Sequence, residues 1–326
     1  MTLFQAIILG IVQGLTEFIP VSSTAHLVFA SRAVGLYDGV EATLRAQQTT
    51  ATMAVVQLGT LLAVLIYFAR DIVNITRAFV RDHIALLRGN EKRALPDGRA
   101  SAPESDRAPE SDRAPESNRA RRDGGATAKL SQEAVLGWLV ILGSVPVAVV
   151  GLLFKKQIEG TFTKNLWIIA TRVIVVAILL AIAEMVGKRN RAMADLGVGD
   201  ALAVGFAQCL ALIPGASRSG STIMAGLFAG EVRETAARFS FLLSIPAVLA
   251  SGLLELKEAV HKLPHGSYGS LAVATIVSGI VGYASIWFLL RYLRTHSTGI
   301  FVAYRLIVGG LILAALFKGY IAAAVN

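Results

Sequence analysis

A glutamine and a glutamate near the N-terminus stand four positions apart in an otherwise apolar stretch. In a helix, Gln13 and Glu17 lie on one face, because residues i and i+4 are neighbours on a helix surface. An ionisable group in an apolar segment is costly and usually faces a cavity. Hard divalent cations prefer oxygen ligands, so Gln13 and Glu17 are candidate ligands for Mg²⁺ or Ca²⁺. The structural alternative is a Glu17 carboxylate that accepts from backbone amides in the following turn.

Three hydroxyl side chains follow directly after Pro20. Ser22, Ser23 and Thr24 stand where a new helix would begin, and the free amides of a helix N-terminus bind anions. His26 comes three residues after Ser23, so the imidazole and the hydroxyl can share a face, and a histidine can accept a proton there. We therefore predict an anion-binding turn with a candidate nucleophile and base. The alternatives are N-capping by one hydroxyl and a structural role for the histidine.

A second polar cluster lies far along the chain, again shortly after a proline. It contains Ser217, Arg218, Ser219 and Thr222 in a glycine-rich turn. Arginine offers a permanent, fork-shaped set of donors that suits a phosphate. These four residues are predicted to form a phosphate cradle. The alternative is a structural ion pair between Arg218 and Glu17.

The composition identifies the environment in which these clusters must work. The chain has 326 residues, of which 54% are hydrophobic and 16% are charged, whereas soluble domains carry about 25% charged residues. Residues 70–129 hold 23 of the 53 charges, so the other 266 residues carry only 30. This excludes a cytosolic enzyme, a nucleic-acid-binding domain and a disordered protein, and predicts a polytopic membrane protein. The net charge of +9 reflects basic residues beside apolar segments, and no nucleic-acid partner is expected.

The hydropathy pattern predicts an all-α fold with six transmembrane helices and two broken apolar segments. The expected spans are residues 48–69, 132–154, 166–187, 239–256, 271–290 and 300–321. The broken segments, at about 4–29 and 201–229, each contain a proline followed by small hydroxyl residues, which end one helix and start another. We expect each to form a re-entrant hairpin, because irregular backbone at membrane depth survives only when it is buried in protein or lines a cavity. A kinked continuous helix is the alternative.

The two broken segments resemble each other. Residues 10–15, Gly-Ile-Val-Gln-Gly-Leu, match residues 205–210, Gly-Phe-Ala-Gln-Cys-Leu. Paired broken helices in an internal repeat are typical of folds whose site lies between the two repeats. Residues 1–326 are thus expected to form a single membrane domain.

One segment does not fit this domain. Residues 90–128 include three nearly identical hexamers of Ala, Pro, Glu, Ser, Asp or Asn, and Arg, which cannot form a core and predict a disordered, low-complexity insertion. If this insertion is cytoplasmic, 20 of the 31 Lys and Arg residues fall on the cytoplasmic side and about 8 on the other. Both termini then lie outside.

The stretches at 14–26 and 214–222 closely resemble the two signature motifs of the bacterial undecaprenyl-diphosphatase (bacitracin-resistance) family. The resemblance implies interlocked inverted-topology repeats in the bacterial inner membrane, with an active site facing the periplasm. It implies hydrolysis of the C55 isoprenyl diphosphate to the monophosphate, which recycles the carrier lipid for cell-wall synthesis. By motif, the catalytic positions are Glu17, Ser23, His26 and Arg218. Gln13 is the neutral variant of a position that holds Glu or Gln, so a metal site here carries one negative charge fewer.

The sequence leaves several alternatives open. Ser23 can attack the terminal phosphorus with His26 as base, or His26 or Glu17 can activate water directly. A secondary transporter or flippase for a lipid phosphate would use the same midplane anion site. A phosphatidic-acid-phosphatase type of enzyme is disfavoured, because its Lys…Arg-Pro motif and its second His motif are absent from the sequence. A homo-oligomer also remains open.

Overall fold

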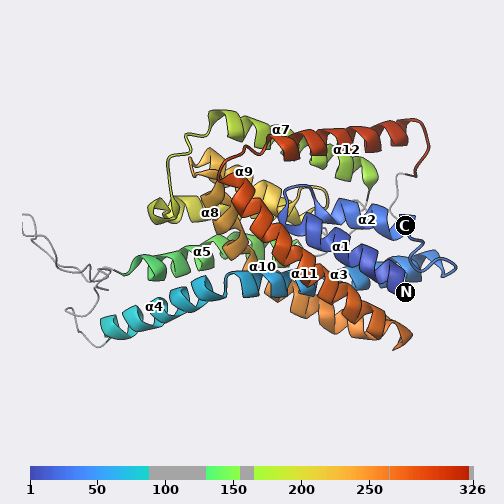
Figure 1. Ribbon diagram of the computed structural model, residues 1–326, viewed down its shortest axis with the longest axis horizontal. Coiled ribbons are helices and arrows are strands. Elements are labelled where there is room, and N and C mark those ends of the chain that lie inside the picture. Colours follow the sequence, from blue (N-terminus) through green and yellow to red (C-terminus); the bar gives the residue numbers. More distant parts are fainter. Residues whose placement is uncertain (88–129, 155–164, 264, 323–326) are drawn as a thin grey trace, which may run out of the picture. The chain divides into compact units, whose positions relative to one another are not determined.

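The computed structural model describes residues 1–87, 130–154, 165–263 and 265–322, and its regular elements there are all helices (Figure 1). These residues fall into two compact units, one of residues 1–70 with 139–326 and one of residues 71–138. The disordered insertion predicted at 90–128 lies outside the described residues. An all-helical fold is thus established for the described part of the chain.

The smaller unit contains most of α4 (Ala69–Leu87) and the first turns of α5 (Gln132–Leu153). The buried Asp82 carboxylate accepts hydrogen bonds from the backbone amide of Ser131 at 2.9 Å and from its hydroxyl at 2.5 Å. The Trp138 indole donates to His83 at 3.0 Å. These bonds hold the start of α5 against α4.

Five helices are long and apolar enough to cross a membrane among the residues described. They are α3 (Ala42–Tyr67), α5, α7 (Leu166–Val186), α11 (Tyr268–Leu293) and α12 (Gly299–Phe317). A multi-pass membrane protein is therefore the class that the structure supports. The sixth expected span, residues 239–256, lies inside the long helix α10 (Arg233–Lys262). Because α10 is not among the five helices, the six-span arrangement stays a prediction.

The first broken segment forms two helices, α1 (Leu3–Phe18) and α2 (Ser23–Ala33). The break falls at Pro20, which lacks the amide hydrogen that a continuing helix needs. The Thr2 hydroxyl and the Gln5 side chain cap the start of α1 reciprocally. The helical pair ends at Ala33, four residues beyond the expected end at 29.

The second broken segment forms α8 (Val198–Cys209), a single 3₁₀ turn and α9 (Arg218–Phe228). Gly215 lies in the turn with φ of +96°, and a Cβ there would lie 2.5 Å from the carbonyl oxygen of Ile169. Only glycine fits this position, because it combines left-handed backbone with close approach to α7. The kinked continuous helix is thus excluded for both segments.

The two hairpins have matching boundaries. The start of α8 lies 195 positions after the start of α1, and both ends of α9 lie 195 positions after those of α2. The sequence repeat at residues 10–15 and 205–210 has the same offset. The internal repeat predicted from the sequence is therefore present in the helix boundaries.

Within the larger unit, α1 packs on α11, α11 on α3, and α3 on α10, while α7 and α12 run side by side (Figure 1). Small residues allow the close approach of α1 to α11. A Cβ on Gly10 would lie 2.6 Å from the Ala274 carbonyl oxygen, and one on Gly14 would lie 2.7 Å from the Val281 Cβ. Helices in membranes associate mainly by such close packing, because lipid supplies no hydrophobic drive between them.

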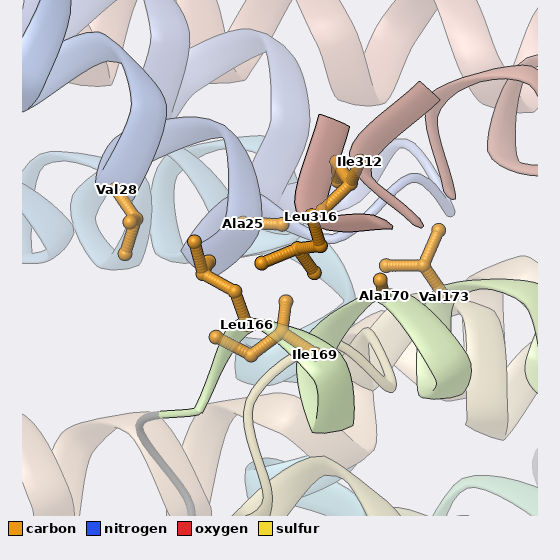
Figure 2. Packing of buried hydrophobic residues seen from close by; sticks show 8 residues of the cluster. All are labelled: Ala25, Val28, Leu166, Ile169, Ala170, Val173, Ile312 and Leu316. Atoms are coloured by element: carbon orange, nitrogen blue, oxygen red, sulfur yellow. The ribbon is translucent and has the colours of Figure 1, made fainter. Parts of the chain in front are cut away.

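The first hairpin also packs against α7 and α12. Figure 2 shows a buried cluster in which Ala25 and Val28 of α2 approach side chains of α7 and α12, including Ile169 and Ile312. One face of α2 is thus held by apolar packing. Its polar residues at the turn remain available for the site.

Candidate functional site

An ion pair joins the tips of the two hairpins. The Arg218 guanidinium at the start of α9 donates to Glu17 Oε1 near the end of α1 at 2.6 Å. Both side chains are largely buried, with 16% and 8% of their surface exposed. Two charged residues from distant parts of the sequence thus meet inside the larger unit, as the structural alternative for Arg218 required.

Gln13 extends this pair along α1. Its side-chain amide donates to Glu17 Oε2 at 3.1 Å and to the Thr60 hydroxyl of α3 at 3.2 Å. The i, i+4 contact expected from the sequence therefore forms. Each carboxylate oxygen of Glu17 has its own partner, so the carboxylate is fixed in orientation.

The turns preceding α2 and α9 share an unusual backbone conformation. Ser22 and Ser217 are the N-cap residues, and both have positive φ, at 81° and 70°. Non-glycine residues adopt this region rarely, and it concentrates at functional sites. The Ser217 hydroxyl accepts from the Gly220 amide at 3.1 Å, whereas the Ser22 side chain makes no cap hydrogen bond. The first turn of α2 is thus left without a side-chain cap.

Two residues of the predicted phosphate cradle bind protein groups instead. The buried Ser219 hydroxyl donates to the Glu17 and Ile19 carbonyl oxygens at 3.4 and 3.3 Å. The fully buried Thr222 hydroxyl lies 2.5 Å from the Ser240 hydroxyl of α10. In this structure both hydroxyls connect elements to one another. Their predicted role as phosphate ligands stays a prediction.

His26 has both ring nitrogens engaged. Nδ1 lies 2.7 Å from the Ser22 carbonyl oxygen, and Nε2 lies 2.6 Å from the Tyr304 hydroxyl, whose ring stacks on the imidazole. A carbonyl oxygen only accepts, so Nδ1 donates to it, and when the ring is neutral Nε2 accepts from the Tyr304 hydroxyl. The proton-accepting nitrogen thus faces Tyr304. The predicted partnership of His26 with Ser23 requires a rearrangement.

Arg305 of α12 is fully buried and connects both turns. It donates to the carbonyl oxygens of Pro20 in the first turn and of Gly215 and Ala216 in the second, and also to that of Val173. The distances lie between 3.0 and 3.3 Å. Arg305 therefore positions the two turns relative to each other.

Two other ionisable residues, Glu184 and Arg172, belong to α7 and not to these two turns. Glu184 pairs with Arg189 and Arg233 and accepts from Thr298, so it ties the end of α7 to its neighbours. Arg172 lies half-buried within α7.

A cavity of about 270 Å³ opens between α2 and α3 beside the hairpin tips. Gln13, Ser23 and Thr24 line it together with Pro214 of the second turn. Ser23 and Thr24 thus lie at the wall of a cavity, and their predicted contact with a ligand stays a prediction.

Tyr304, Thr60 and Ser240 are contact residues that sequence reasoning missed. Tyr304 directly precedes Arg305 in an apolar helix, and this neighbouring charge was the sequence feature that could have indicated Tyr304 as a site residue. Thr60 and Ser240 are hydroxyl residues in apolar helices, which commonly bond to their own backbone. Nothing in their local sequence indicates Gln13 and Thr222 as partners.

The predicted cation ligands lie in contact but do not form a closed cage. Among the described residues, no group of three or more His, Cys, Asp or Glu side chains converges on one point. One carboxylate and one amide suit Mg²⁺ better than Ca²⁺. Mg²⁺ keeps several waters and takes further ligands from substrate phosphates, whereas Ca²⁺ needs more oxygen ligands. Glu17 and Gln13 therefore fit a cation that arrives with a phosphorylated substrate.

Fold and site together define a class: a multi-pass helical membrane protein in which two helical hairpins bring a carboxylate and a guanidinium together beside a cavity. The chain belongs to the bacitracin resistance protein BacA family, whose profile matches residues 6–311. The match includes most of the first hairpin, all of the second and Arg305.

Similar proteins extend over nearly the whole chain. A protein named undecaprenyl-diphosphatase from Syntrophobacter fumaroxidans is 46% identical over 98% of this chain and 99% of its own. Proteins of the same name from Chlorobium phaeobacteroides and Mycolicibacterium gilvum are 43% and 42% identical, each over 99% of this chain and 100% of its own. The chain is thus similar in full length to proteins with one shared name.

Proposed function

We propose that this protein hydrolyses undecaprenyl diphosphate to undecaprenyl phosphate and inorganic phosphate. The reaction returns the carrier lipid to cell-wall synthesis and gives resistance to bacitracin. The observation that carries the proposal is the Glu17–Arg218 pair at the hairpin tips, beside a cavity lined by Ser23 and Thr24. Full-length similarity to proteins named undecaprenyl-diphosphatase supports it.

The tip residues suit phosphoryl transfer, which depends mainly on positioning and on neutralising charge. A diphosphate that reaches Arg218 replaces Glu17 as the partner of the guanidinium. This exchange frees the Glu17 carboxylate while the substrate is bound. Arg218 then neutralises the phosphate oxygens through its fork of donors.

Two routes for the attack remain open. In the first, Ser23 Oγ bonds to the terminal phosphorus, the bond to the lipid phosphate oxygen breaks, and the Ser23 proton passes to His26 Nε2. Water then hydrolyses the phosphoserine. In the second, water attacks directly, activated by His26 or Glu17. Either use of His26 requires Tyr304 to release Nε2, because a single lone pair serves both contacts.

Substitution of Ser23 separates the two routes. If Ser23 is the nucleophile, Ser23→Ala abolishes turnover, and a quenched reaction of the unsubstituted protein contains phosphoserine at position 23. If water attacks directly, Ser23→Ala retains substantial turnover. Thr24→Ala is the matched control, since Thr24 lines the same cavity one position further along α2.

A divalent cation is part of the proposal. Glu17 and Gln13 would hold Mg²⁺ next to the substrate phosphates, where it would neutralise negative charge. Glu17 would then hold the cation, and Arg218 would hold the phosphate.

We also propose the finer membrane arrangement that the sequence favours. It has six spanning helices and two re-entrant hairpins in inverted repeats, in the bacterial inner membrane, with the site facing the periplasm. The isoprenyl chain remains among the lipid while the diphosphate enters the cavity. A homo-oligomer remains part of the hypothesis.

Phosphate release from C55 diphosphate by the detergent-purified full chain tests the function. We expect release that falls when a chelator is added and that returns with Mg²⁺. Glu17→Gln serves as the inactive reference. A correctly folded wild-type protein that releases no phosphate would contradict the proposal, and a flippase without hydrolysis would give this result.

A further inference from the structure

His26 lies beside the cavity at the hairpin tips but does not line it. Ser23 before it on α2 and Leu27 after it both belong to the cavity wall, whereas His26 does not. The imidazole instead contacts Tyr304 of α12. In this structure the predicted base therefore lies outside the space in which we place the diphosphate.

Tyr304 makes two different contacts with this imidazole. Its hydroxyl lies 2.6 Å from Nε2 of His26, and its ring stacks on the imidazole with 5.6 Å between the ring centroids and 14° between the planes. Nδ1 donates to the Ser22 carbonyl oxygen at 2.7 Å, so Nε2 is the nitrogen that carries the lone pair of the neutral ring. The tyrosine hydroxyl therefore occupies the one position on His26 that can accept a proton.

Tyr304 and the nucleophile compete for this lone pair. A general base must lie within hydrogen-bond reach of the proton that it accepts. The Ser23 hydroxyl or a water molecule can donate to Nε2 only after the Tyr304 hydroxyl has left, because one lone pair serves one donor. The contact with Tyr304 thus lowers the fraction of the protein in which His26 is ready to act.

The structure gives Tyr304 room to move while its neighbour stays in place. The Tyr304 side chain is 42% exposed, whereas Arg305, the next residue of α12, is fully buried and donates to four carbonyl oxygens. The bond between Tyr304 and His26 shares no atom with these contacts. Arg305 can therefore hold the two turns together while Tyr304 releases the imidazole.

We propose that Tyr304 is a positioning residue that keeps His26 in a resting orientation, with Nε2 occupied, until the nucleophile replaces its hydroxyl. This inference rests on the proposed function for the reaction in which His26 serves as base. After the exchange, the oxygen of Ser23 or of water bonds to the terminal phosphorus, and its proton passes to Nε2. The bond from phosphorus to the lipid phosphate oxygen breaks, and the lipid monophosphate leaves with that electron pair.

Acylation by diethyl pyrocarbonate tests the contact without any turnover. The reagent attacks an imidazole nitrogen that has a free lone pair, and mass spectrometry of the detergent-purified full chain gives the rate at each histidine. We expect His26 to react about two- to tenfold faster in Tyr304→Phe than in the wild type, the factor by which one hydrogen bond of ordinary net strength shifts an equilibrium. The phenylalanine ring retains the stacking, so the difference reports the hydroxyl.

Tyr292→Phe is the matched control, because the Tyr292 ring also stacks on a histidine. The centroids of Tyr292 and His296 are 4.5 Å apart with 13° between the planes, but Nδ1 of His296 has the Thr295 hydroxyl as its partner, at 2.8 Å. Removal of the Tyr292 hydroxyl should therefore leave the acylation rates of both His26 and His296 unchanged.

A single turnover of C55 diphosphate measures the consequence for the reaction. At saturating substrate, Tyr304→Phe should raise the rate by about two- to tenfold. The substrate concentration for half-maximal rate should stay the same, because neither Tyr304 nor His26 lies in the cavity wall. The gain should vanish in the double variant His26→Ala/Tyr304→Phe, since Tyr304 acts through His26. A gain in rate cannot result from misfolding.

The proposal is overturned if His26 is acylated equally fast in the wild type and in Tyr304→Phe. It is also overturned if the wild type hydrolyses the lipid and Tyr304→Phe does so no faster, since the hydroxyl would then not hold back the base. Faster acylation of His26 in Tyr304→Phe, together with a wild type that releases no phosphate, would contradict the proposed function and support the positioning of His26 by Tyr304.

Discussion

The two hairpins share a frame but carry different chemistry. Gln13 and Gln208 occupy equivalent positions 195 residues apart, as do Ser22 and Ser217 at the caps. At the first position of the following helix, however, Ser23 corresponds to Arg218. The first hairpin thus supplies a hydroxyl where the second supplies a cation.

The same division holds on the preceding helices. Glu17 in the first hairpin corresponds to Leu212 in the second. Gln13 bonds to Glu17 and Thr60, whereas the buried side-chain amide of Gln208 has no hydrogen-bond partner among the described residues. Because the tips of the two hairpins meet, one hairpin can supply the carboxylate and the other the guanidinium for a polyanionic substrate.

The largest expected effect comes from breaking the contact between the two tips. Glu17→Gln and Arg218→Ala should each lower phosphate release from the lipid diphosphate by about 10²–10³-fold, as the loss of a preorganised charged donor or its partner does. Gln208→Met is the control in the second hairpin and should retain activity. Near wild-type turnover in either tip variant would show that the hairpins do not divide the chemistry in this way.

The next effect concerns Arg305, which binds the turns of both hairpins. Arg305→Met removes donors to carbonyl oxygens in both turns and should lower the stability of the folded protein by about 3 kcal/mol, since unpaired buried groups are costly. Arg305→Lys should restore little, because an ammonium lacks the planar fork. Thermal unfolding in detergent measures both. Unchanged unfolding in Arg305→Met would mean that the turns hold their positions without it.

A smaller, pH-dependent effect distinguishes the segments that follow each hairpin. Leu36 follows the first hairpin. At the equivalent position after the second, Glu231 is fully buried, and neither of its carboxylate oxygens has a hydrogen-bond partner among the described residues. The pKa of Glu231 is raised to about 7, mainly by burial and also by the negative charge of Asp200, while the positive charge of Arg191 opposes the shift. The folded protein therefore binds a proton more tightly than the unfolded chain does.

The sign of the pH dependence follows from this shift. The contribution of Glu231 to stability is complete below about pH 4.5 and is lost as the pH rises through about 7. Glu231→Gln should therefore unfold at a higher temperature than the wild type at pH 8, with a free energy of unfolding that is larger by a few kcal/mol at most, and at a similar temperature at pH 5. A constant difference across this range would show that the carboxyl does not titrate there.

The smallest expected effect compares the two caps directly. Ser217→Ala removes the hydrogen bond to the Gly220 amide and should lower stability by about 1 kcal/mol. Ser22→Ala removes no cap bond and should change stability less, although both serines have positive φ and the backbone strain is the same in kind. Equal losses in thermal unfolding would indicate that the caps are equivalent.

The sequence by itself determined the membrane environment and the positions at which the two apolar segments are interrupted. A charge content of 11% outside residues 70–129 is a property of composition, and it requires a membrane whatever the packing. Pro20 and the glycine-rich turn at Ser217 end and start helices through local sterics and capping. The i, i+4 contact of Gln13 with Glu17 is likewise local. These features depend on neighbours in the chain, which the sequence shows.

Only the tertiary structure decided which partners the polar groups take. His26 bonds to Tyr304 and Thr222 to Ser240, and Arg305 reaches carbonyl oxygens of both turns. Each bond joins residues on different helices, and its geometry depends on how those helices cross. Helix crossing in turn follows from close packing at small residues such as Gly10, where a fraction of an ångström decides the contact. The sequence names the groups that react, but the packing decides which groups they face.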